Sequence, residues 1–132
     1  MGSEDIDRLL DARTVAVVGL SSNAARDSHR VARYMQEHGY RIVPVNPNET
    51  EVLGEKAYAR LADIPFDIDI VDVFRRREHL KGVVGEAIAK GAWGVWGQEG
   101  VADNEATSVA EAAGLAFVMN RCLMVEHARR RG

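Results

Sequence analysis

Short apolar runs alternate along the chain with longer stretches in which apolar residues recur every three or four positions. Apolar runs of this length are typical of strands buried on both faces, and the longer period is typical of amphipathic helices. Strands are predicted at residues 14–20, 41–45, 68–74, 92–96 and 115–119. Their alternation with helices predicts an α/β fold of three layers, in which helices cover both faces of a five-stranded parallel sheet.

The helical stretches lie between these strands and at the two ends of the chain. Ile6, Leu9 and Leu10 would form the apolar stripe of a short opening helix within residues 3–12. Further helices are predicted at 28–38, 78–90, 104–113 and 123–130, with a short helix around 58–61. If every crossover is right-handed, the strands take the order 3-2-1-4-5, and residues 1–132 form a single domain.

Sheets of this kind hold a ligand at the carboxyl ends of their strands, where the chain direction switches. With the predicted order, the switch lies between the first and the fourth strand. Polar residues follow every strand end, in the segments 19–28, 46–48, 74–77, 97–100 and 120–122. These five loops are therefore the predicted lining of one binding site.

The first loop runs from Gly19 to Ser28 and leads into a helix whose free amide groups favour an anion. Arg26 can hold phosphate oxygens through two parallel hydrogen bonds, and the Ser28 hydroxyl can supply another. This chemistry predicts a polyphosphate ligand. The alternative is that Ser28 only caps the helix and that Arg26 is a solvated loop residue.

The first loop also departs from the dinucleotide fingerprint, because only Gly19 of its three glycines is present. Ser21 and Ala24 stand where the other two are expected. Asn46, at the end of the second strand, lacks the carboxylate with which NAD enzymes bind the ribose hydroxyls. An NAD(P)- or nucleotide-dependent enzyme on the same fold is therefore the alternative interpretation and not the preferred one.

Composition narrows the class of protein further. The net charge of −3 provides no general attraction to nucleic acid or to an acidic membrane. The single cysteine, Cys122, excludes an intramolecular disulfide and a cysteine-based metal cage, and it fits a reducing cytosol. The first residues do not resemble a signal peptide, and no apolar run approaches the length of a membrane span. We expect a cytoplasmic protein without a metal.

Six sequence motifs occur together in a fixed order. They are VAVVGLS followed by Arg26 and Ser28, GYRIVPVNP at 39–47, EVLGEKAY at 51–58, DIVDVFR at 69–75, VWGQEG at 95–100 and MNRC at 119–122. Through them, residues 14–127 resemble the stand-alone coenzyme A (CoA)-binding proteins, whose domain is similar to the amino-terminal domain of the succinyl-CoA synthetase α subunit. The resemblance implies a Rossmann-like domain with CoA as its cofactor.

The resemblance also implies which residues contact the cofactor. Those around the pyrophosphate would be Gly19, Ser21, Ser22, Arg26 and Ser28. Those on the nucleotide side would be Asn46, Phe74 and Arg75. Those facing the pantetheine arm would be Trp96, Gln98, Asn120, Arg121 and Cys122, although a tryptophan on a buried strand is more often a core residue. Asn120 stands where many relatives have an aspartate, so an ion pair from this position to Arg121 or Arg75 is in doubt.

From its 132 residues we expect the chain to lack the second domain and the phosphohistidine through which succinyl-CoA synthetase transfers phosphate. The resemblance thus implies a protein that binds CoA or acyl-CoA without catalysis, as a carrier, sensor or accessory protein, with a homodimer or a protein partner left open. Cys122 precedes a helix next to Arg121, which would stabilise a thiolate and permit a mixed disulfide with CoA. A buried, inert cysteine is the alternative.

Overall fold

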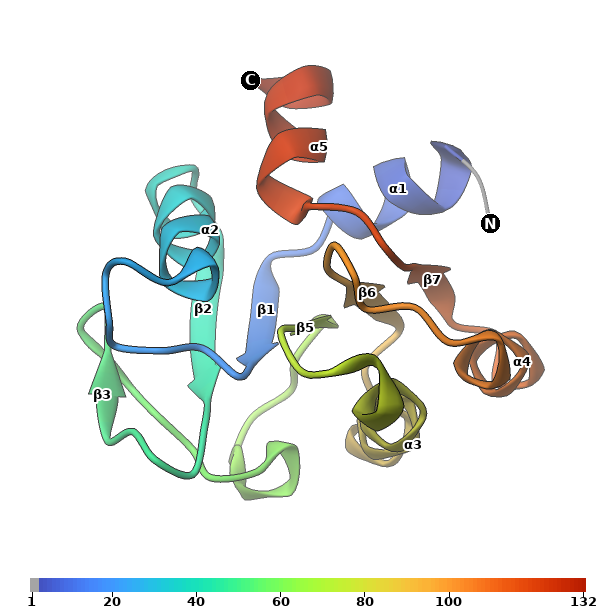
Figure 1. Cartoon of the computed structure of the whole chain (residues 1–132), viewed down its shortest axis with the longest axis horizontal. Coiled ribbons are helices and arrows are strands. Elements are labelled where there is room, and N and C mark those ends of the chain that lie inside the picture. Colours follow the sequence, from blue (N-terminus) through green and yellow to red (C-terminus); the bar gives the residue numbers. More distant parts are fainter. Residues whose placement is uncertain (1–2) are drawn as a thin grey trace.

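The computed structural model describes residues 3–132, and its centre is one parallel sheet (Figure 1). The sheet consists of β1 (Thr14–Val18), β2 (Arg41–Val45), β5 (Ile70–Val73), β6 (Gly94–Gly97) and β7 (Ala116–Val118). Every pairing within it is parallel. The predicted α/β class, the three layers and the five parallel strands are confirmed.

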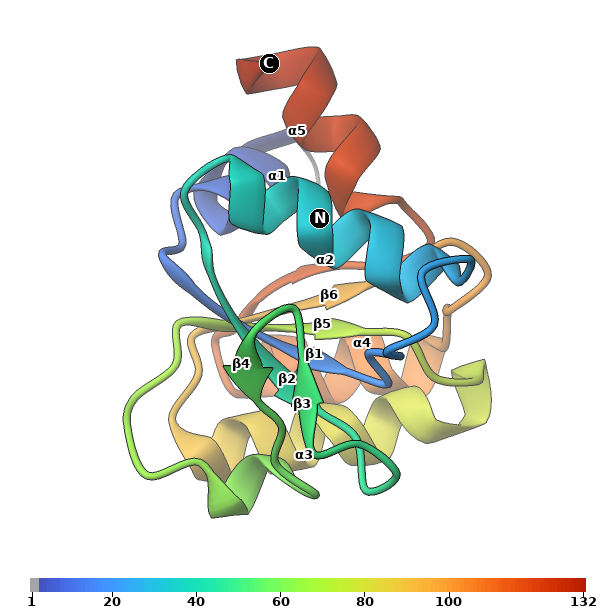
Figure 2. The same cartoon turned by 90° about the vertical axis from the view of Figure 1, so that its left-hand side faces the viewer.

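Helices cover both faces of the sheet, as Figures 1 and 2 show. One face carries α1 (Ser3–Leu10), α2 (Asp27–Glu37) and α5 (Leu123–Arg131). The other carries α3 (Leu80–Lys90) and α4 (Asn104–Ala112), together with the short 3-10 helices η1 (Leu61–Asp63) and η2 (Arg77–His79). The predicted helix at 78–90 is therefore divided between η2 and α3.

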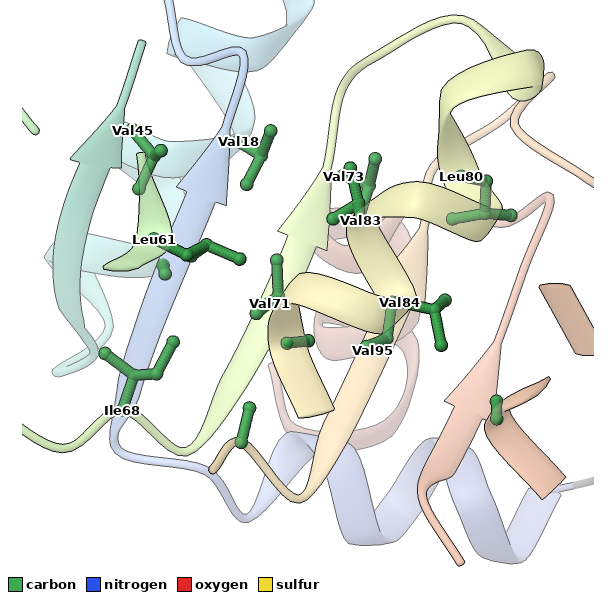
Figure 3. Close-up of a cluster of buried hydrophobic side chains, with 14 of the residues drawn as sticks. Val18, Val45, Leu61, Ile68, Val71, Val73, Leu80, Val83, Val84 and Val95 are labelled. Carbon is green, nitrogen blue, oxygen red and sulfur yellow. The ribbon is translucent and has the colours of Figure 1, made fainter. Parts of the chain in front are cut away.

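Side chains alternate along each strand between two buried clusters. On the α3 side, Val18, Val71 and Val73 pack against Leu61 and Val83 (Figure 3). On the opposite side, the intervening strand residues pack against α1, α2 and α5. Strands that are apolar at almost every position are required here, because both faces are covered.

The predicted strand order 3-2-1-4-5 is wrong. Numbered by their order along the chain, the parallel strands run 2-1-3-4-5, and the third of them, β5, pairs with β1 through positions such as Val15 and Ile70. Right-handed crossovers permit either order, so handedness alone does not decide between them. The chain direction switches between β1 and β5, and this is where the crevice is expected.

Pro44 explains why β2 lies at the edge of the sheet. Its carbonyl accepts a hydrogen bond from the Tyr58 amide (3.0 Å), on the side away from β1. The nitrogen and carbonyl of one strand residue point to the same side, so the missing N–H of Pro44 also faces outward. An edge strand tolerates this loss, whereas a strand paired on both sides would lose a ladder hydrogen bond.

The segment after β2 contains a hairpin that the sequence pattern did not predict. Strands β3 (Glu51–Val52) and β4 (Glu55–Lys56) pair antiparallel around a two-residue turn. The turn residues Leu53 (φ +56°) and Gly54 (φ +77°) both adopt positive φ, as a type I′ turn requires. Leucine is unusual in this conformation, which is why the turn was missed. The short helix predicted around 58–61 begins only at Leu61, as η1.

Candidate functional site

A cleft of about 1130 Å³ opens at the carboxyl ends of β1, β2 and β5. Its walls come from the first loop and the start of α2, from residues 46–49, from residues 59–61, and from α3. Its floor is apolar and consists of Val18, Val45, Leu61 and Val83, which Figure 3 shows together. The site thus combines a polar rim with an apolar base, at the point where the chain direction switches.

Gly19 occupies the tightest position in the site. Its φ is +89°, and a Cβ atom built on it would lie 2.3 Å from the carbonyl oxygen of Phe74. Its amide donates to the Val45 carbonyl (2.8 Å), and the Phe74 amide donates to the Val18 carbonyl (2.8 Å). Only glycine can combine the positive φ with this close contact to Phe74. A residue without a side chain is therefore required where the ends of β1, β2 and β5 meet.

Side chains of the first loop bond to its own backbone. The Ser21 amide donates to Ser28 Oγ (3.1 Å), the Asn23 amide to Ser21 Oγ (3.0 Å), and the Ala25 amide to Asn23 Oδ1 (2.9 Å). Ser28 is buried and lies within the first turn of α2 instead of preceding it. The interpretation of Ser28 as a helix cap is therefore wrong, because its hydroxyl closes the loop.

The start of α2 is left without a side-chain cap. Arg26 occupies the N-cap position in an extended conformation and makes no capping hydrogen bond. Asp27 and Ser28, which begin the first helical turn, line the cleft. Uncapped amides at a helix start favour an anion, both through hydrogen bonds and through the helix dipole.

Arginines supply positive charge around the same cleft. Arg26 and Arg75 are exposed and form no ion pair within residues 3–132. Sequence reasoning missed a third arginine, Arg60, which pairs with Asp63 at 3.5 Å. Arg60 reaches the site because the backbone of Tyr58 pairs with that of Val45 at the end of β2. No pattern in the local sequence predicts this pairing.

Glu49 is a second lining residue that sequence reasoning missed. Its Oε2 accepts a hydrogen bond from the Ser22 amide at 2.8 Å. Asn46 fastens the turn that carries it, since Asn46 Nδ2 donates to the Leu20 carbonyl (3.0 Å) and Asn46 Oδ1 accepts from the Asn48 amide (2.9 Å). The Asn-Pro-Asn sequence indicates a turn, but it does not indicate where the following glutamate points.

Seven of the thirteen predicted site residues line this cleft, and Ser22 lies beside it. The seven are Gly19, Ser21, Arg26, Ser28, Asn46, Phe74 and Arg75. The other five lie on or after β6 and β7, outside the cleft. The structure therefore divides the predicted residues into two groups.

The residues of the second group, on and after β6 and β7, form hydrogen bonds with the neighbouring loops. Trp96 is fully buried, as the core interpretation predicted, and its Nε1 donates to the Arg121 carbonyl (2.8 Å). Gln98 Oε1 accepts from the Leu123 amide (3.2 Å), and Asn120 Oδ1 accepts from the Gly100 amide (2.8 Å). These bonds join the end of β6 to the start of α5.

Arg121 and Cys122 complete this group. Arg121 pairs with Glu126 of α5 at 3.7 Å and not with residue 120. Cys122 is half-buried at the N-cap of α5 and packs against the α1, α2 and α5 side of the core. Contact of these residues with a pantetheine arm stays a prediction, as does the mixed disulfide.

Asp72 is a buried carboxyl that sequence reasoning did not single out. It lies in β5 between Val17 and Trp96 of the neighbouring strands, is 1% exposed, and its Oδ1 has no hydrogen-bond partner within the described residues. Burial raises the pKa of this carboxyl well above its usual range, although a hydrogen bond from the Val73 amide acts in the opposite direction. It is separate from the cleft.

Within residues 3–132, no cluster of three or more histidine, cysteine or acidic side chains is arranged to hold a metal ion. In the same part of the chain, no helix has the length and apolar character needed to span a bilayer.

Comparison with known proteins identifies the class. A family model described as "CoA binding domain" matches residues 13–128, so the chain belongs to this family. Uncharacterized protein YneT of Bacillus subtilis is 44% identical over 117 residues, covering 89% of this chain and 87% of YneT. The α subunit of ADP-forming acetate–CoA ligase II of Pyrococcus furiosus is 28% identical, but this chain spans only 28% of its length.

Solved structures agree with the fold. A hypothetical protein from Pyrococcus horikoshii OT3 superposes with a TM-score of 0.93 at 43% identity, covering 100% of this chain and 94% of the other. A dinucleotide-forming acetyl-CoA synthetase from Ca. Korarchaeum cryptofilum has a TM-score of 0.75 at 20% identity, over 87% of this chain and 28% of its own, and shows the shared fold alone. The expected Rossmann-like, CoA-binding family is confirmed.

Proposed function

We propose that this protein binds CoA or acyl-CoA in the cleft between β1, β2 and β5, with the diphosphate against the first loop and the start of α2. The observation that carries the proposal is the uncapped start of α2, which borders a cleft that also holds Arg26 and Arg75. Membership of the CoA-binding domain family supports CoA over other polyphosphates.

The residues present fit the chemistry of CoA. The absence of a side chain at Gly19 keeps the loop close to Phe74, so the cradle that receives the diphosphate stays intact. Arg26 would contact the diphosphate, and Arg75 would contact the phosphate on the ribose. The apolar floor at Val18, Leu61 and Val83 offers an adenine ring surface that excludes water.

We further propose that the protein acts as a carrier, sensor or accessory protein and not as a catalyst. The histidine nearest the first loop, His29, has its Nδ1 bonded to the Ser21 carbonyl at 2.9 Å. His38 and His127 form an aromatic cluster with Tyr34 between α2 and α5. The ligase activity of the longer relatives belongs to those proteins, of which this chain matches a part.

A thermal-shift panel with CoA, acetyl-CoA, NAD, NADP and ATP tests the ligand class, because a ligand that binds only the folded state raises the melting temperature. We expect CoA and acetyl-CoA to raise it at concentrations where NAD and NADP do not. A selective response to NAD or NADP would favour the alternative enzyme, and no response to any ligand would contradict the proposed function.

A further inference from the structure

Glu49 brings a negative charge to the loop that is proposed to receive a diphosphate. Its carboxylate accepts from the Ser22 amide at 2.8 Å, and Glu49 belongs to a turn in which its own amide donates to the Asn46 carbonyl (3.2 Å). The Asn46 side chain in turn donates to the Leu20 carbonyl, at the start of the first loop. The turn is thus fastened to the first loop at two points, and one of them is this carboxylate.

The Glu49 contact is chemically the same contact that a phosphate oxygen makes with a loop amide. Both are anionic oxygens that accept a backbone N–H, and such charge-assisted bonds are stronger than neutral ones. The neighbouring amides at Ser21 and Asn23 bond to neutral hydroxyl groups. Ser22 therefore differs from these neighbours, because its partner is an anion from a different segment of the chain.

A diphosphate in this loop would meet the Glu49 charge at short range. Glu49 lines the same cleft as Arg26 and is only partly buried, so its side chain can turn into solvent at the cost of one hydrogen bond. Like charges in contact oppose each other even where water screens them. Diphosphate binding and the Glu49–Ser22 bond are therefore competing states of the loop.

We propose that Glu49 is an internal competitor for the anion site, which holds the first loop closed until a diphosphate displaces it. This inference rests on the proposed function for its physiological ligand, but the competition itself applies to any diphosphate. Glu49 thereby keeps the affinity for CoA below the maximum that the loop allows.

The test measures binding of two probes, CoA and inorganic pyrophosphate, by calorimetry. The variants are Glu49→Gln, which keeps an acceptor without the charge, Glu49→Ala, which frees the Ser22 amide, and Glu51→Gln as the matched control. Glu51 is exposed on β3 and lies outside the cleft. Its variant therefore makes the same change in net charge as Glu49→Gln, but not in the cleft. We expect the Glu49→Gln dissociation constants for both probes to fall by about three- to fivefold, as for an exposed charge interaction. Glu49→Ala should gain at least as much, and Glu51→Gln should stay within about twofold of wild type.

A nitrogen–proton correlation spectrum gives a second readout. The Ser22 amide should move in Glu49→Gln and should move again when pyrophosphate is added, while amides of the distant helices stay in place. Affinity that is unchanged or weaker in both Glu49 variants would overturn the proposal, and so would an equal gain in Glu51→Gln. Pyrophosphate binding that tightens while CoA binds no variant would support the competition and contradict CoA as the ligand. Failure of both probes in all variants would overturn both proposals.

Discussion

At one end of the carboxyl edge of the sheet, the loops after β1, β2 and β5 surround a cleft, whereas the loops after β6 and β7 bond to each other. The first region leaves the start of α2 uncapped and two arginines unpaired within residues 3–132. In the second, Trp96, Gln98 and Asn120 each place one polar side-chain atom on a backbone group of the adjoining segment. We infer from this difference that the first region contacts the ligand and that the second mainly holds the scaffold.

Gly19→Ala should have the largest effect, because the added Cβ would clash with the Phe74 carbonyl and the residue would keep a positive φ. We expect a loss of about 2–4 kcal/mol in unfolding free energy, measured by urea denaturation, and loss of CoA binding. Gly39→Ala is the control, since Gly39 also has a positive φ (+93°) but an added Cβ there would meet nothing within 4 Å. Equal losses in the two variants would show that the close approach to Phe74 is unimportant.

Arg26→Ala should separate binding from stability. We expect CoA affinity to fall by about 1.5–3 kcal/mol by calorimetry, because a charge-assisted phosphate contact is lost, while the melting temperature stays near that of wild type. Arg121→Ala is the matched control from the second region, where the arginine pairs with Glu126 at 3.7 Å. If Arg121→Ala weakens CoA binding as much as Arg26→Ala does, the two regions are not functionally distinct.

Trp96→Phe should lower stability without changing CoA affinity, the reverse of Arg26→Ala. The variant removes the indole N–H that bonds to the Arg121 carbonyl and leaves part of a fully buried volume empty. We expect a loss of about 1–3 kcal/mol in unfolding free energy, with CoA affinity changed by less than about twofold. A large loss of affinity in a variant that remains folded would instead place Trp96 in the binding site.

At about pH 4, Asp72→Asn should have the smallest effect, because there it exchanges one neutral buried polar group for another. The pKa of Asp72 is raised in the folded protein by burial, so the unfolded chain releases this proton at lower pH than the folded one. The free energy of unfolding of the wild type should therefore fall as the pH rises from about 4, relative to the variant. Melting temperatures of both proteins at pH 4 to 8 measure this, and a difference that does not widen with pH would contradict it.

The fold was largely predictable because its signals are local. The apolar runs and the helical periods fall within single elements, so all five parallel strands and the main helices were found. The strand order was not predicted, because it depends on whether β5 pairs with β1 or with β2. The only sequence signal for an edge position of β2 is Pro44, which has no N–H to donate to a further strand. The 51–56 hairpin was missed because Leu53 adopts a positive φ that its residue type does not predict.

The site was predictable only in part, for a related reason. Gly19, Ser21, Arg26 and Ser28 were found because they lie in one loop between a strand and a helix. Glu49 and Arg60 reach the cleft through tertiary packing that no local pattern encodes. The Trp96 group was assigned to the same site through the family resemblance and because its loops share the carboxyl edge. It lies outside the lining of the cleft, with β6 two strands from β1, or roughly 10 Å, and its contact with CoA stays a prediction.

A CoA titration followed by nitrogen–proton correlation spectra tests the central claim most directly, because one experiment observes both regions. We predict that the amides of the first loop and of the start of α2, between Gly19 and Ser28, shift first and most, while the Trp96 indole signal stays in place. Shifts confined to the loops after β6 and β7, with the first loop unchanged, would contradict the account.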